Sequence, residues 1–150
     1  AGMITVHASG GRDMIAAARE AVEGSDTHIL AVTILTSLSA EMLQREVGLP
    51  ETPEAAALRL GRQAIAAGAH GLVCSPQEAR VLRAAIGPKP LLVTPVVRPE
   101  WAAKDDQARV ATPREAGPHD GATHIVVGRP ILGHANPAEA VRLINEELAS

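Results

Sequence analysis

Two arginines stand in segments shaped by proline or glycine, and they are the side chains of this sequence best suited to bind an anion. Arg98 lies between Pro95 and Pro99, which stiffen its loop. Arg129 follows Gly128, where the lack of a side chain lets backbone N–H groups approach a ligand. A guanidinium group can make a two-pronged contact with a phosphate. The pair therefore predicts a phosphate site, although each segment is also typical of a turn carrying a solvated arginine.

The other reactive side chains form no recognisable catalytic or metal-binding set. The six histidines and Cys74 lack the spacing of metal ligands, so no metal is expected. Lys89 precedes an apolar run, the wrong end for a ligand site in parallel sheets, and Lys104 lies in a polar segment. Thr36 could bond a polar edge of a ligand or help to cap the next helix, and His7 could be an acid–base group or a structural residue.

Five short apolar runs must position these side chains. They are residues 3–7 (MITVH), 28–34 (HILAVTI), 71–74 (GLVC), 91–94 (LLVT) and 124–127 (HIVV). The second run is nearly continuous, which is typical of a parallel strand buried on both faces. Arg98 and Arg129 follow the fourth and fifth runs. We therefore expect both arginines at the carboxyl edge of one sheet, where ligands bind in such folds.

Helical sequence follows each run and is usually opened by a capping residue. We expect helices over about 12–22, 39–45, 52–67 and 75–86, and from 112 and 136 onward. In the last helix the apolar residues Ala140, Val141, Ile144 and Leu148 are predicted to face inward.

This alternation of strand and helix predicts an α/β fold with a parallel sheet. A complete (β/α)8 barrel needs about 250 residues, or about 30 for each unit. At that rate the 150 residues hold about five units, which matches the five runs. The sequence therefore predicts one domain over residues 1–150 that is a partial TIM barrel. An open, doubly wound sheet of five strands is the alternative at this point.

Composition excludes several classes of function. The net charge of −3 and the presence of a single aromatic residue of the Phe/Trp/Tyr class, Trp101, argue against nucleic-acid binding. No apolar run approaches the roughly 18 residues of a membrane span, and no signal peptide is recognisable. The single cysteine cannot form an intrachain disulfide, which suits a reducing compartment, so we expect a cytoplasmic protein.

Six motifs occurring in order resemble orotidine 5′-phosphate decarboxylase, and the resemblance covers essentially the whole chain. They are residues 7–11 (HASGG), 31–37 (AVTILTS), 73–78 (VCSPQE), 94–99 (TPVVRP), 106–107 (DQ) and 127–131 (VGRPI). Each motif is short, but six in register are specific.

The resemblance implies a dimeric (β/α)8 barrel that converts orotidine 5′-phosphate to UMP and CO₂ in pyrimidine biosynthesis, without metal or cofactor. It implies that Arg129 and the Gly128 backbone bind the 5′-phosphate, with Gln107 and Arg98 beside it, and that Thr36 contacts the pyrimidine edge. The substrate-binding set that it implies comprises Thr36, Pro95, Arg98, Gln107, Gly128 and Arg129. The expected partners are a nucleotide monophosphate and a second copy of the chain, which could instead associate through open sheet edges.

Two departures from the family pattern shape the prediction. Val96 stands where the family's loop usually has glycine, and a β-branched residue tolerates positive φ poorly. The family's Asp-x-Lys-x-x-Asp motif, which carries the proton-donating lysine, is absent, so the sequence matches strands four to eight and no catalytic residue is assigned. We therefore expect this chain alone to be inactive. The alternatives are a non-catalytic phosphate-binding half-barrel and another phosphosugar-binding barrel enzyme.

Overall fold

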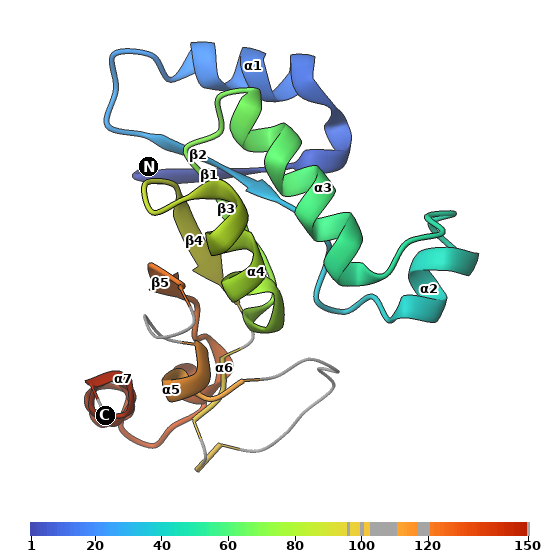
Figure 1. Ribbon diagram of the computed structural model, residues 1–150. Coiled ribbons are helices and arrows are strands. Elements are labelled where there is room, and N and C mark those ends of the chain that lie inside the picture. The colour runs from blue at the N-terminus through green and yellow to red at the C-terminus, as the bar shows by residue number, and fades with distance from the viewer. Residues whose placement is uncertain (96, 100, 103–110, 117–120, 150) are drawn as a thin grey trace.

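The computed structural model describes residues 1–95, 97–99, 101–102, 111–116 and 121–149, in which strands alternate with helices (Figure 1). In chain order the elements are β1 (Met3–His7), a 3-10 turn η1 (Ala8–Gly10), α1 (Arg12–Ala21), β2 (His28–Val32), α2 (Ala40–Arg45), α3 (Pro53–Ala66), β3 (Gly71–Val73), α4 (Pro76–Ile86), β4 (Leu91–Thr94), α5 (Pro113–Ala116), β5 (His124–Ile125), α6 (Arg129–Leu132) and α7 (Pro137–Ala149).

Within the described residues the five strands form one parallel sheet in the order β1-β2-β3-β4-β5. Each strand pairs with the one that follows it in the chain, as in the pairing of Met3 with His28 and of Leu30 with Gly71. A doubly wound sheet reverses its strand order at a switch point, and this sheet does not. The arrangement is that of an arc of a (β/α)8 barrel. The predicted partial barrel of five parallel strands is confirmed, and the doubly wound alternative is wrong.

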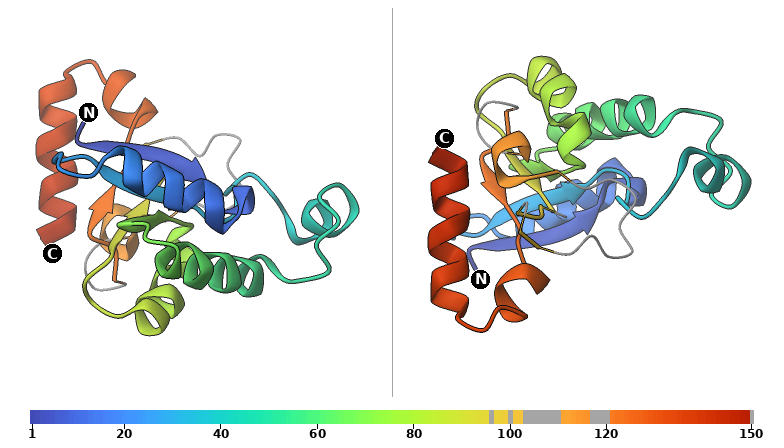
Figure 2. Two further views of the ribbon diagram at one scale, coloured as in Figure 1. Left: turned by 90° about the horizontal axis from the view of Figure 1, so that it is seen from above. Right: turned by 90° about the horizontal axis from the view of Figure 1, so that it is seen from below.

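The helices follow one another around the sheet in the same order as the strands. α1 contacts α3, α3 contacts α4, α4 contacts α5, and α5 contacts α7. Figures 1 and 2 show that α2 stands apart from the sheet, on the long connection between β2 and α3. This succession leaves the carboxyl ends of the strands to the connecting segments, which is where both predicted arginines lie.

The core is built from small and aliphatic side chains, because the sequence has neither Phe nor Tyr. Ala56 and Ala57 of α3 are completely buried. At Gly61 an added Cβ would lie 2.8 Å from Leu72 Cδ1 and 2.9 Å from Leu82 Cδ2. The small residues of α3 therefore let this helix approach β3 and α4 closely, and dense packing replaces aromatic bulk.

Helix starts agree with the capping residues read from the sequence. The Ser39 hydroxyl accepts a hydrogen bond of 3.2 Å from the Met42 N–H, and the Thr52 hydroxyl accepts one of 3.2 Å from the Ala55 N–H. Each cap satisfies a backbone donor that the first turn of a helix leaves unpaired.

Strand ends were less accurately predicted. β2 ends at Val32 rather than at residue 34, β3 at Val73 rather than at residue 74, and β5 at Ile125 rather than at residue 127. Val126 still donates to the Thr94 carbonyl over 2.9 Å, but the chain then turns into α6, a short helix that the sequence did not predict. The ends of these ladders depend on where the neighbouring strand stops, which the run of apolar residues does not specify.

One burial prediction was wrong for a geometric reason. Val141 is 41% exposed, because the buried face of α7 is set by Ala140 and Ile144 at i and i+4, and Val141 lies one step around the helix. Exposure is also seen in β1, where Met3 and Ile4 are 39% and 44% exposed, because β1 is at the edge of the sheet that the described residues form.

Candidate functional site

The segment after β4 presents Arg98 from a well-anchored backbone. The Arg98 N–H donates a 2.8 Å hydrogen bond to the Ala111 carbonyl, next to a β-bridge between Val97 and Ala111. Val97 and Ala111 are buried in a small apolar cluster with Ala116. The Arg98 residue as a whole is only 7% exposed. This anchoring holds the first arginine at the carboxyl edge of the sheet.

The segment after β5 presents Arg129 as the first residue of α6. The Gly128 carbonyl accepts a 3.1 Å hydrogen bond from the Leu132 N–H, and the Arg129 carbonyl accepts one of 2.8 Å from the Gly133 N–H. Arg129 itself is exposed. Because β4 and β5 are parallel neighbours, the residues that follow them emerge at the same edge of the sheet.

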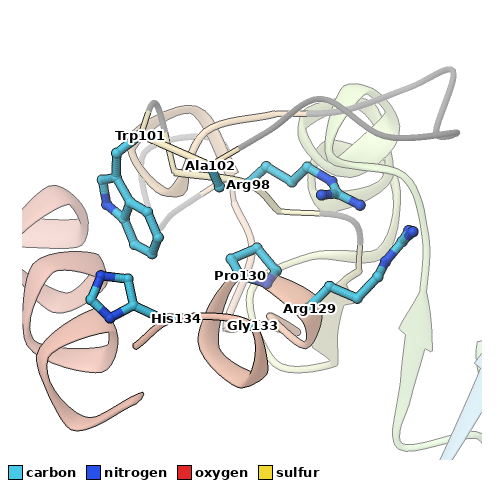
Figure 3. Close-up of a pocket in the computed structure, with 7 residues that line it drawn as sticks. All are labelled: Arg98, Trp101, Ala102, Arg129, Pro130, Gly133 and His134. Carbon is cyan, nitrogen blue, oxygen red and sulfur yellow. The ribbon is translucent and has the colours of Figure 1, made fainter. Parts of the chain in front are cut away.

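The two arginines line one pocket of about 290 Å³ (Figure 3). Its lining residues are Arg98, Trp101, Ala102, Arg129, Pro130, Gly133 and His134. In Figure 3 the guanidinium groups of Arg98 and Arg129 extend in the same direction, whereas Trp101 and His134 lie at the other end of the pocket, toward α7. Two guanidinium groups directed to one side offer several charge-assisted hydrogen-bond donors to an oxyanion.

Within the described part of the chain, none of the other predicted site residues lines this pocket. Pro95 and Gly128 lie on the same two segments as the arginines but do not line the pocket. Thr36 lies in the turn after β2, which is separated from β4 by β3, and it does not line the pocket either. Gln107 is outside the described residues, as is Val96.

Trp101 and His134 are pocket residues that the sequence reading missed. Their rings meet edge to face, with centroids 5.2 Å apart and planes inclined at 71°. The available signal was positional, since Trp101 follows Arg98 by three residues and His134 follows Arg129 by five. Neither spacing alone indicates a contact, because the two side chains belong to different segments.

The described residues outside the pocket supply no second reactive centre. Burial raises the pKa of the Cys74 thiol to about 12, and that residue is 1% exposed, so the thiol stays protonated and inaccessible at neutral pH. The described part of the chain contains no group of three His, Cys, Asp or Glu residues arranged to hold a metal ion. Among the described helices, none is long and apolar enough to cross a membrane.

Comparison with protein families gives one match that spans nearly the whole chain. Residues 1–144 match the model of the Orotidine 5′-phosphate decarboxylase / HUMPS family. The orotidine 5′-phosphate decarboxylase of Anaeromyxobacter sp. (strain K) is 56% identical over 144 residues, which cover 96% of this chain and 62% of that protein. The enzyme of the same name from Gluconobacter oxydans is 52% identical, over 99% of this chain and 64% of that protein.

Solved structures give the same result at the level of the fold. The crystal structure of orotidine 5′-phosphate decarboxylase from Lactobacillus acidophilus matches with a TM-score of 0.83 and 36% sequence identity. The match covers 99% of this chain and 63% of that one. The chain therefore spans somewhat less than two thirds of the length of these relatives.

Proposed function

Because this chain belongs to the Orotidine 5′-phosphate decarboxylase / HUMPS family, we propose that it is the phosphate-binding part of an orotidine 5′-phosphate decarboxylase barrel. Its ligands are the 5′-phosphates of orotidine 5′-phosphate and of the product UMP. The observation that carries the proposal is that Arg98 and Arg129, from successive units of the barrel, line one pocket.

The arginines have different roles in this proposal. Arg98 is nearly buried on an anchored backbone, so its guanidinium group is held in place before a ligand arrives. Arg129 is exposed and closes on the phosphate from the start of α6, with the Gly128 backbone next to it. Gln107 and Pro95 belong to the same phosphate loop, and Thr36 contacts the pyrimidine edge in a complete barrel.

The phosphate contacts supply binding energy at a distance from the reacting carbon. In the reaction the bond between the pyrimidine ring and its carboxylate breaks, CO₂ leaves, and the resulting ring carbanion takes up a proton. Energy gained at the phosphate can position the pyrimidine and close loops over it. The proton comes from the lysine of the Asp-x-Lys-x-x-Asp motif, which this sequence does not contain. The chain therefore contributes substrate binding rather than the proton donor.

Titration of the chain with UMP by isothermal calorimetry tests the site. Replacing a charged, hydrogen-bonding side chain at a binding site costs roughly 10- to 100-fold in affinity. We expect Arg98→Ala and Arg129→Ala each to weaken UMP binding by this factor. Arg142→Ala is the matched control, because Arg142 pairs with Glu139 on the exposed surface of α7, outside the pocket. Unchanged UMP affinity in Arg129→Ala would falsify the site.

A second candidate function is a non-catalytic nucleotide-binding half-barrel, favoured by the absence of the lysine motif. A decarboxylation assay separates it from the first. The chain alone should give no turnover of orotidine 5′-phosphate. Adding a separate polypeptide with the first three units of a family barrel, motif included, should restore turnover if the chain is part of an enzyme. UMP binding with no restored turnover supports the second function.

A further inference from the structure

The contact between Trp101 and His134 joins the two segments that carry the arginines. Trp101 follows Arg98, and His134 follows Arg129. Their rings meet edge to face at a centroid distance of 5.2 Å (Figure 3). This geometry is the favourable one for two aromatic rings. The contact lies at the end of the pocket away from the guanidinium groups, so it can hold the two segments together without occupying the anion site.

Trp101 lies in a turn that begins directly after Arg98. The Arg98 N–H donates to the Ala111 carbonyl over 2.8 Å, and the Ala102 N–H donates to the Pro99 carbonyl over 3.0 Å. The second bond closes a turn that contains Trp101. A displacement of the indole is therefore transmitted to the backbone of Arg98 over a few residues.

His134 is fixed in the same way on the other segment. The Gly133 N–H donates to the Arg129 carbonyl over 2.8 Å, and the His134 N–H donates to the Ile131 carbonyl over 3.3 Å. The ring Nδ1 lies 2.7 Å from the Asn136 carbonyl oxygen and 3.0 Å from the Asn136 nitrogen, so the backbone before α7 holds the imidazole. The protonation of Nδ1 determines which of the two contacts is the hydrogen bond.

We propose that Trp101 and His134 are positioning residues that fix Arg98 and Arg129 relative to each other before the anion binds. This inference rests on the proposed phosphate site and adds two residues to it. Without the ring contact, the parts of the two segments that carry the rings are held together less firmly, and the ligand must order them at a cost in affinity. The proposal assigns neither ring a contact with the phosphate.

Calorimetric titration with UMP, and with inorganic phosphate as the smaller probe, measures this effect. We expect Trp101→Ala and His134→Ala each to weaken binding by about two- to tenfold, the range that an aromatic pair supports. The double variant should bind about as well as either single variant, because each change removes the same contact. Trp101→Phe, which keeps an aromatic ring, should restore most of the affinity.

Leu132→Ala is the control, because Leu132 is 81% exposed on α6 and does not line the pocket. Wild-type affinity in Trp101→Ala, or additive losses in the double variant, contradict the proposal.

The effect must also depend on the arginines. In an Arg129→Ala background, Trp101→Ala should cause little further loss of affinity, whereas a general weakening of the fold would lower affinity in both backgrounds. If the arginine variants themselves bind UMP normally, the proposed function fails. If they bind weakly while Trp101→Ala and His134→Ala bind normally, only the positioning role fails.

Fluorescence tests the contact directly in solution. Trp101 is the only Trp and there is no Tyr, so the intrinsic emission of the folded chain reports on this one ring. His134→Ala should shift the emission of Trp101, and Leu132→Ala should not. An unchanged emission in His134→Ala would show that the rings do not meet, and this result would overturn the proposal.

Discussion

The imidazole of His70 lies at the amino-terminal edge of the sheet, opposite the pocket. Its Nδ1 accepts a 2.9 Å hydrogen bond from the Ile29 N–H, and its ring meets that of His28 edge to face at 5.1 Å. Burial, the charge of Arg19 and the neighbouring His28 lower the pKa of His70 below its ordinary value. Protonation of Nδ1 would remove the acceptor and add a positive charge beside two basic groups.

This lowered pKa predicts an acid-sensitive contribution to stability. In the unfolded chain His70 takes up a proton near pH 6.5, whereas in the folded chain it takes up a proton only at a lower pH. The free energy of unfolding should therefore fall as the pH drops below about 6.5 and stop falling below the folded pKa. His70→Asn keeps an acceptor but does not titrate, so its urea midpoint should change less between pH 7 and pH 5.

His7→Asn is the matched control for that measurement, because His7 is an exposed histidine at the far end of β1. It should keep the wild-type dependence on pH. The prediction is contradicted if His70→Asn and the wild type lose stability in parallel. Because His70 and the pocket lie at opposite edges of the sheet, UMP affinity of His70→Asn at pH 7 should be unaltered.

Sequence reading identified the arginines and missed the rings for a physical reason. Arg98 has a proline on either side that restricts the backbone, and Arg129 follows a glycine, whose missing side chain lets the backbone approach a ligand. These are local signals. The contact of Trp101 with His134 depends on two segments meeting in space, and nothing in either segment alone specifies it.

β3 is a three-residue strand, and a single glycine sets how closely β4 can approach it. Gly71 pairs with Leu91, and a Cβ added to Gly71 would lie 2.6 Å from the Leu91 Cβ and close to its carbonyl oxygen. These atoms belong to the backbone of the neighbouring strand or are attached directly to it, so they cannot move aside without shifting that strand.

Gly71→Ala should therefore destabilise the fold by about 1–3 kcal/mol, the usual cost of overpacking a dense core. Urea unfolding followed by far-UV circular dichroism measures it. Gly2→Ala is the control, because a Cβ at Gly2 meets nothing within 4 Å. Equal midpoints for the two variants would show that the strands separate easily and that the close approach is not required.

The existence of each strand was predictable, and its length was less so. β1 and β4 have the predicted bounds, since each coincides with its apolar run. β2, β3 and β5 are shorter than their runs, because pairing ends where a neighbour departs. The fold class was read from the alternation alone, whereas the choice between a barrel arc and a doubly wound sheet needed the strand order.

The molecule as a whole presents the edge of a parallel sheet along β1. Met3 and Ile4 are exposed there, and β1 pairs only with β2 within the described residues. An uncovered apolar edge strand is a template for pairing with another chain. We therefore expect a second copy of the chain to pair along this edge when the separately supplied units are not present.

Analytical ultracentrifugation tests this association at micromolar concentration. The wild-type chain should sediment as a dimer or larger species, and Ile4→Lys should shift the distribution toward the monomer, because a charge on an edge strand opposes pairing. Val47→Lys is the control, since Val47 is similarly exposed at 49% but lies after α2, away from the sheet edge. A monomeric wild-type chain would contradict this expectation.

The consecutive strand order also bears on the order in which the molecule can be assembled during synthesis. β1 and β2 can pair once residue 32 has been made, and each later unit adds to a ladder that already exists. Each unit packs against its neighbour in the sequence, so the sheet can grow one unit at a time as synthesis proceeds. The pocket is different, because its lining is complete only after both Arg129 and His134 have been synthesised, well after Arg98. A chain that stops short of these residues would keep most of its sheet and lose the anion site entirely.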